Sequence, residues 1–311
     1  MLENIDLSKY NLKNDIIFKY VFGYEEHSQI LIQLLNSILD LDYENRIIEI
    51  TYLNSINLKQ YLNDKLTILD IKAKDNKERL FNIEMQLRKE DFFISRIIYY
   101  HDKLFISQFI NKASYSELNK TITIAFVDFE LFPDIKDYHN IFRYKNVKTG
   151  DELTDIKELH FIELRKLTHT SGKSNDLSKW IFTFNESNKL INLYKLPKQL
   201  QGEEAIQMAL KAMKKALSDE QVRELIEFRE KAINDENQRL YNAHSNGIQI
   251  GEQRGIQIGE QRGILLGKNQ GDYEARRLIA KNLINKGNSI KDIIDITGLT
   301  QKQIEDLFVE N

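Results

Sequence analysis

The chain has 311 residues, of which 41% are hydrophobic, so it can form a packed core. Its charges nearly cancel to a net −3, so any contact with nucleic acid must come from a local basic patch rather than from overall charge. The absence of cysteine excludes disulfides, cysteine-ligated zinc and thiol catalysis, and the six histidines form no HxxxH pair. Because the sequence also lacks an apolar signal segment and any apolar run of membrane-spanning length, we expect a cytoplasmic protein without a membrane partner.

The first predicted elements are helical. Dense apolar residues with helical spacing predict helix from Asp15 to Leu41, and Gly23 is expected to divide it into two helices. Asn14 or Asp15 is expected to cap the first of these helices. The β-branched and aromatic residues of 47–53 (IIEITYL) then predict a strand.

A β-hairpin is predicted over residues 69–87. Apolar and polar residues alternate on both sides of the turn sequence at 75–77 (DNK), so the hairpin has one apolar and one polar face. With a three-residue loop, Lys74 is expected to pair with Glu78. A two-residue loop would shift the pairing by one residue, so that the polar residues of the two strands would no longer lie on the same face. The arrangement of the polar face therefore depends on the register.

The polar face of this hairpin carries the candidate site. In the expected register Asp70 lies opposite Asn82, Glu84 is its diagonal neighbour, and Gln86 shares their face. Two carboxylates on adjacent strands suffice to hold Mg²⁺, which prefers hard oxygen ligands and keeps several waters. Lys72 is a possible accessory residue that could add positive charge on the same face. From spacing alone, the alternative is a polar face that is simply solvated.

The elements after the hairpin predict a mixed α/β core. Residues 91–112 predict a helix, from which Arg96 could reach the site as an accessory residue or could form a surface ion pair. The strongly apolar segment 121–129 predicts a central strand, and 140–146 and 159–165 predict further strands. Strand, strand, helix, strand is the order of an α/β fold.

An internal repeat follows a predicted helical region. GIQIGEQR occurs at 247–254 and again at 255–262, and glycine occupies every fourth position from 247 to 271, seven times in all. Each glycine costs a helix roughly 1 kcal/mol relative to alanine. However, glycines at this spacing form a ridge that another backbone can approach closely. The pattern predicts a helix that forms when paired with another chain or with its own domain; a flexible linker is the alternative.

The last segment, 273–311, predicts a small unit of short helices that resembles a helix-turn-helix. Ser289 is expected to cap one helix, Gly298 to end it, and Thr300 to cap the final helix. That final helix is mainly acidic. Because a recognition helix is normally basic, packing or oligomerisation is favoured over contact with DNA.

Six blocks of the sequence, in this order, resemble the Rpn family of recombination-promoting nucleases, also labelled transposases, of the PD-(D/E)XK nuclease superfamily. The blocks are NDIIFKYVFG (14–23), ILDIKAKD (68–75), FNIEMQ (81–86), RIIYYHDKLFISQ (96–108), YSEL (115–118) and TITIAFVDF (121–129). The resemblance is strongest over residues 10–135. It implies a restriction-endonuclease-like α/β core, with a mixed central sheet flanked by helices, and Mg²⁺-dependent cleavage of DNA in which Mn²⁺ can substitute.

The same resemblance implies roles for individual residues. Asp70 would be the first metal-binding acid of the motif, Glu84 the second, and Gln86 would occupy the position that usually holds lysine. Leu69 stands where the motif has proline. Asp15 matches an acid often present on the first helix and could be a third metal or water ligand; its alternative is the helix cap.

We therefore expect four segments: a nuclease-like core over 1–175, a helical region over 176–245, the glycine repeat over 246–272, and the helix-turn-helix-like unit over 273–311. The expected activity is hydrolysis of DNA phosphodiester bonds with Mg²⁺, linked to recombination or mobile elements. The expected partners are DNA and further copies of the chain, bound through 247–311. The alternative is a catalytically weak or inactive nuclease fold that acts in DNA binding or assembly through its C-terminal helical repeat.

Overall fold

The structure is a computed structural model that describes residues 10–53, 71–111, 114–167 and 175–309. The chain divides into two compact units, Met1–Ala232 and Ile233–Asn311. Asp70, the first acid of the predicted pair, lies outside the described residues.

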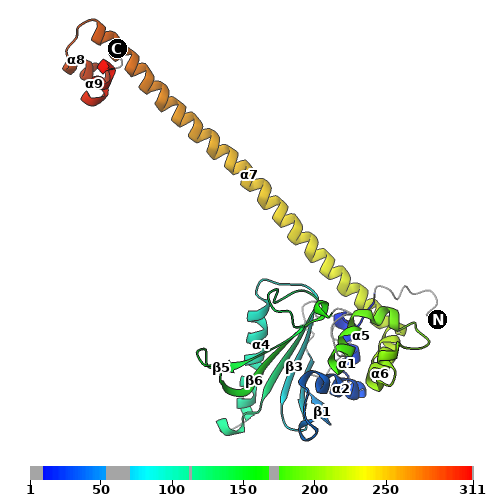
Figure 1. Cartoon of the computed structure of the whole chain (residues 1–311). Coiled ribbons are helices and arrows are strands. Elements are labelled where there is room, and N and C mark those ends of the chain that lie inside the picture. The colour runs from blue at the N-terminus through cyan, green and yellow to red at the C-terminus, as the bar shows by residue number, and fades with distance from the viewer. Residues whose placement is uncertain (1–9, 54–70, 112–113, 168–174, 310–311) are drawn as a thin grey trace. The chain divides into compact units, whose positions relative to one another are not determined.

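A mixed sheet forms the first unit, and its described strands follow the order β1-β2-β3-β4-β6-β5 (Figure 1). Strands β3, β4 and β6 are parallel, whereas β1, β2 and β5 pair with their neighbours in the antiparallel sense. The mixed central sheet confirms the predicted α/β class, and the apolar strand after the helix is central, as expected. The strands are β1 (Ile50–Tyr52), β2 (Ile71–Asp75), β3 (Leu80–Gln86), β4 (Thr121–Val127), β5 (His139–Lys145) and β6 (Glu152–Glu163).

Helices cover both faces of the sheet (Figure 1). Helix α4 (Phe93–Ser107) makes the crossover that the parallel strands β3 and β4 require, and it packs on one face. The opposite face packs against a set of helices that share one large core. These are α1 (Asp15–Phe22), α2 (Ser28–Leu39), α5 (Asp176–Leu190), α6 (Glu204–Ser218) and the first turns of α7 (Glu220–Asn285).

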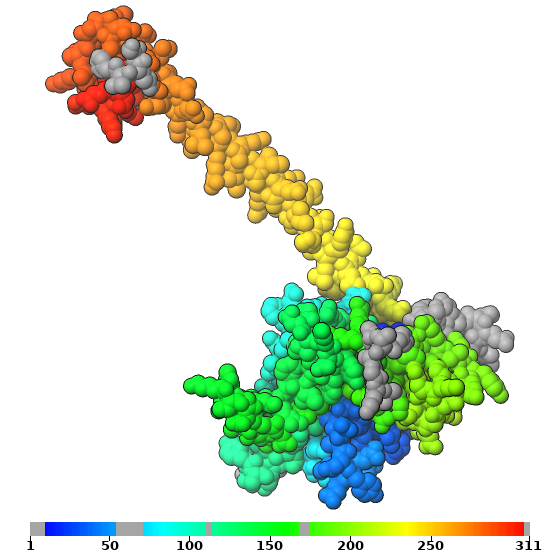
Figure 2. All heavy atoms as spheres, in the orientation of Figure 1, coloured from blue at the N-terminus to red at the C-terminus, as the bar shows by residue number. Residues whose placement is uncertain are grey.

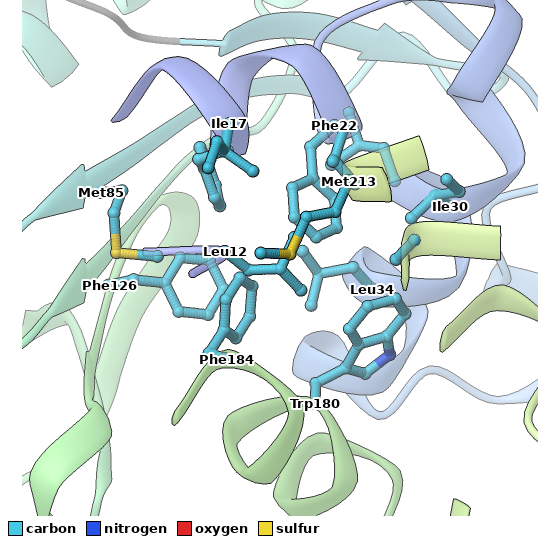
Figure 3. Close-up of a cluster of buried hydrophobic side chains, with 14 of the residues drawn as sticks. Leu12, Ile17, Phe22, Ile30, Leu34, Met85, Phe126, Trp180, Phe184 and Met213 are labelled. Atoms are coloured by element: carbon cyan, nitrogen blue, oxygen red, sulfur yellow. The ribbon is translucent and has the colours of Figure 1, made fainter. Parts of the chain in front are cut away.

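The large core is rich in aromatic side chains (Figure 3). The ring of Phe184 on α5 lies 5.1 Å from that of Phe126 on β4 and 5.6 Å from that of Phe22 on α1, measured between centroids. Met85 of β3 reaches the same core (Figure 3). Because side chains alternate along a strand, the residues on either side of Met85 face α4 instead.

Local signals set the first helices as predicted. The Asn14 side chain accepts hydrogen bonds from the backbone N–H groups of Ile16 and Ile17, which caps α1. Gly23 ends α1, and α2 begins at Ser28. The predicted division of this segment into two helices is therefore confirmed.

The hairpin of β2 and β3 forms, but the predicted register is wrong. Lys74 pairs with Leu80 rather than with Glu78. The loop has three residues as expected, but it is 76–78, and Glu78 adopts a positive φ of 62°. Asp75 stays in β2 because its buried carboxylate accepts hydrogen bonds from backbone N–H groups of the turn. The shift is an even number of residues, so the two faces keep their members.

In the second unit, the remainder of α7 is followed by α8 (Ile290–Thr297) and α9 (Gln301–Val309). Ser289 caps α8, and Gly298 ends it in the left-handed conformation, with φ 67°. Thr300 and Gln303 exchange the hydrogen bonds of a capping box before α9, as predicted.

The glycine repeat lies within α7, and its side chains are exposed in the single chain (Figure 2). A small apolar core joins α8 and α9 to the end of α7. In the described part of the chain, no helix combines the length and the apolar character needed to cross a membrane.

Candidate active site

The polar residues of β3 are buried between the sheet and α4. Asn82 and Glu84 lie beside Thr123 and Ala125 of β4, on the face where α4 packs. Asn82 is 0% exposed and Glu84 is 5% exposed. The alternative interpretation, a solvated polar face, is therefore wrong for these two side chains. A buried carboxylate is expensive unless a charge or hydrogen-bond donor compensates it.

Arg96 supplies that compensation. Its Nη2 lies 2.7 Å from Oε1 of Glu84 and 3.0 Å from Oε1 of Gln86. Its Nη1 lies 2.6 Å from Oε2 of Glu90. The guanidinium thus joins a buried carboxylate, an amide oxygen and a surface carboxylate at one point.

Local structure brings Arg96 to this point. Arg96 lies in the first turn of α4, and its backbone N–H bonds to the carbonyl of Phe92 one turn earlier. Gln86 ends β3 and donates from Nε2 to Oε1 of Glu90 at 2.9 Å, which ties the loop between strand and helix to the site. Arg96 is only 28% exposed, so its charge is partly shielded from solvent.

The other predicted residues are placed as follows. Lys72 of β2 lies opposite Asn82 and is half-buried, so it shares the face of Glu84. Asp15 is on α1, where its Oδ2 lies 3.0 Å from Nε of Arg229 and its Oδ1 accepts the N–H of Ile16. The structure thus brings Glu84, Gln86 and Arg96 together, and the described contacts of Asp15 lie elsewhere.

Two parts of this arrangement were not predicted from the sequence. Glu90 was not singled out. It lies six residues before Arg96, in the short loop between β3 and α4, and this loop brings its carboxylate back to Arg96. Asn82 was placed on the polar face but not given a role. His101 on α4, which bonds to Thr123 beside Asn82, was treated only as one of six scattered histidines. The alternation of polar residues was the available signal for Asn82, but its burial depends on α4.

The donor set fits a divalent cation in part. The carboxylate of Glu84 and the amide oxygen of Gln86 are hard oxygen donors of the kind that Mg²⁺ takes. Within the described ranges, no group of three or more histidine, aspartate or glutamate residues could hold a metal ion. The second carboxylate of the predicted pair is that of Asp70, which directly precedes Ile71 of β2 and lies outside the described residues.

The chain matches the sequence model of a known protein family. The sequence model of a family described as PD-(D/E)XK nuclease family transposase matches residues 12–243, which is more than half of the chain. The matched region includes every described strand of the sheet, helix α4 and the Glu84–Arg96 pair. No curated protein and no solved structure gives a match.

Proposed function

We propose that this chain, which belongs to the family of PD-(D/E)XK nuclease transposases, is a metal-dependent endonuclease that hydrolyses phosphodiester bonds of DNA. The observation that carries the proposal is the buried carboxylate of Glu84, held by Arg96 beside the amide of Gln86 within the matched region. Perturbed or costly charges of this kind cluster at functional sites.

The two acids Asp70 and Glu84 are the proposed metal ligands. Ile71 pairs with Ile83 across the hairpin, and Asp70 and Glu84 are their direct neighbours in sequence. Mg²⁺ needs only one or two carboxylates besides its waters, and Mn²⁺ accepts the same oxygen ligands. When bound, the ion would neutralise charge at the phosphate and lower the pKa of the attacking water.

Arg96 and Gln86 would together take the roles of the lysine that the family motif usually has. Gln86 stands at the motif position but carries no charge, whereas Arg96 brings a guanidinium to the same amide oxygen. We assign to Arg96 the neutralisation of charge that develops on the phosphate, because a guanidinium matches phosphate oxygens in geometry. Gln86 would orient the water or the phosphate, and Lys72 would add positive charge on the same face.

We also propose that the protein works as a dimer or higher oligomer, assembled through 247–311. Cutting both strands of a duplex usually requires two active sites. Aliphatic side chains along α7, such as Ile256 at 62% exposed and Ile264 at 73% exposed, favour association with a second copy. These side chains also support the second candidate function, in which the nuclease fold binds DNA or assembles with little catalysis.

The experiment that tests the proposal is cleavage of supercoiled plasmid by the purified chain with Mg²⁺ or Mn²⁺. We expect nicking or linearisation that is lost with EDTA, in Asp70→Ala and in Glu84→Gln. The matched control is Asp75→Asn, which changes another buried carboxylate of the same hairpin and should leave cleavage intact. Cleavage that survives Asp70→Ala and Glu84→Gln would refute the site. No cleavage by the unchanged chain with either ion would favour the binding function.

A further inference from the structure

A second cluster of polar groups is buried beside the proposed site. Asn82 is 0% exposed and His101 is 3% exposed. Within the described part of the chain, neither Nδ2 nor Oδ1 of Asn82 has a hydrogen-bond partner, and the same holds for Nε2 of His101 and Nε of Arg96. All four atoms lie at the interface between β3 and α4.

These groups continue the row that contains Glu84. Nδ1 of His101 lies 2.9 Å from Oγ1 of Thr123, and Thr123 is the neighbour of Asn82 across the parallel strands β3 and β4. Asn82 is in turn two residues from Glu84, on the same face of β3. Along this interface, the polar groups thus run from Thr123 and His101 through Asn82 to Glu84 and Arg96.

Burying such groups without hydrogen bonds costs free energy, and proteins seldom do it without a reason. Elsewhere in the same unit, the buried Asn36 is fully used, since its side chain bonds both the N–H and the carbonyl of Ile47. A leucine at position 82 would have the same number of side-chain heavy atoms with the same branching and no cost of this kind. Groups that reduce stability in this way are retained mainly where function needs them.

The chemistry of the cluster fits water. Burial lowers the pKa of His101 to about 4, so its ring is neutral near pH 7, with one nitrogen that donates and one that accepts. The amide of Asn82 likewise offers both a donor and an acceptor. An anion would use only donors and a bare cation only acceptors, whereas a water molecule uses both. Buried water typically makes about three such bonds.

We propose that Asn82 and His101 bind ordered water next to Glu84, and that Asn82 is thereby a positioning residue for the divalent cation. This inference rests on the proposed function. Asn82 acts through water on the surroundings of Glu84 and does not itself hold the ion. Groups that orient the ligands of a metal site typically change metal affinity or activity by about 10–100-fold when they are removed.

The test is a titration of the full chain with Mn²⁺, in which electron paramagnetic resonance measures the free ion. Only the Mn²⁺ binding that is lost in Glu84→Gln is assigned to the proposed site. We expect Asn82→Leu to weaken that binding by at least about tenfold. We expect Asn82→Ser, which keeps a donor and an acceptor, to stay within about threefold of the unchanged chain.

Stability gives the second readout. Urea unfolding without metal, followed by the fluorescence of Trp180, the single tryptophan, should show Asn82→Leu as stable as the unchanged chain or more so. The matched control Asn36→Leu should lose stability, because it leaves two backbone groups of Ile47 without partners, and should leave the Mn²⁺ affinity of the folded protein unchanged. If Asn82→Leu does not fold, Asn82→Ala carries the same comparison.

The outcomes separate this inference from the proposed function. Unchanged Mn²⁺ binding and cleavage in Asn82→Leu would overturn the inference and leave the nuclease proposal standing. Weakened binding in Asn36→Leu as well would overturn it too, because the effect would then be a general one on the fold. If the unchanged chain has no Mn²⁺ binding that depends on Glu84, the proposed function falls, and the inference falls with it.

Discussion

Arg96 Nη2 lies 2.7 Å from Oε1 of Glu84, a carboxylate whose side chain is 6% exposed, while Nη1 of the same guanidinium lies 2.6 Å from the exposed Glu90. One cation therefore bridges a buried acid and a surface acid. A divalent ion that binds Glu84 would share this acid with Arg96. If this ion weakens the bond between Arg96 and Glu84, the guanidinium still has Glu90 as a partner.

This relationship predicts how Arg96→Ala behaves. Without metal, the variant leaves Glu84 buried without the guanidinium of Arg96, and we expect the free energy of unfolding to fall by about 2 kcal/mol after allowance for the partial exposure of Arg96. Mg²⁺ should restore much of this loss, because the ion replaces the missing charge. Cleavage should still fall by about 10²–10³-fold, because the phosphate loses a charged donor. Urea unfolding with and without Mg²⁺, together with plasmid cleavage, measures these effects.

The control for Arg96→Ala is Arg143→Ala. Arg143 Nε lies 2.7 Å from Oε2 of Glu158, whose side chain is 3% exposed, so a similar ion pair is broken on the opposite face of the sheet. We expect a smaller loss of stability, because Lys120 and His160 still bond to Glu158, and we expect that Mg²⁺ does not restore it. If Mg²⁺ rescues both variants equally, the ion does not act at Glu84.

The sequence predicts those parts of the fold that depend on local chemistry. Asn14, Gly23 and Ser289 act as the caps and stops that their types favour, and alternation identifies the two faces of the hairpin. The register of the hairpin was missed because Glu78 adopts a left-handed conformation that favours glycine, asparagine or aspartate. A turn that has glutamate at the left-handed position cannot be recognised from the residue types that usually mark such turns.

The candidate site was predictable only in part, for a different reason. Spacing and resemblance together point to Glu84 and Gln86 and to a contribution from Arg96. The burial of Asn82 and Glu84 follows from α4 packing across the sheet, which depends on contacts between Phe93 or Ile97 and strand β4. Such contacts between distant segments are not visible in the periodicity of either segment alone.

Burial of His101 predicts a dependence of stability on pH. Its pKa is lowered from 6.5 to about 4 by burial, so the unfolded chain binds a proton between these values and the folded chain does not. The contribution to stability is complete above about pH 6.5 and is lost as the pH falls, by up to about 3 kcal/mol near pH 4. Urea unfolding between pH 7 and pH 4.5, followed by Trp180 fluorescence, should therefore show a shallower slope for His101→Asn. The exposed His244 offers the control, and an equal change in His244→Asn would contradict the assignment.

Glu158 predicts a second effect at lower pH. Burial alone would raise the pKa of its carboxyl group, but hydrogen bonds from His160, Lys120 and Arg143 outweigh burial and hold the pKa well below its usual value of 4.5. This group therefore stabilises the fold fully above about pH 4.5, and its contribution falls by about 1.4 kcal/mol for each pH unit below that. Glu158→Gln should be less stable at pH 7 and should lose stability more slowly between pH 4.5 and pH 3. Parallel curves for the variant and the unchanged chain would contradict this account.

The glycine repeat of α7 gives a prediction in which two effects have opposite signs. In the single chain, a Cβ added at Gly255 or Gly259 meets nothing within 4 Å, so the double change to alanine should raise the stability of the isolated helix by about 1 kcal/mol at each position. If a second copy packs against the glycine ridge, the same two methyl groups keep the backbones apart and weaken the assembly. We therefore expect circular dichroism to show equal or greater helix content, while sedimentation shows a shift toward monomer. The matched change of Gln253 and Gln257 to alanine should raise helix content without that shift. Tighter association in the glycine variant would place the contact elsewhere on α7, and a monomeric unchanged chain would remove the proposed assembly altogether.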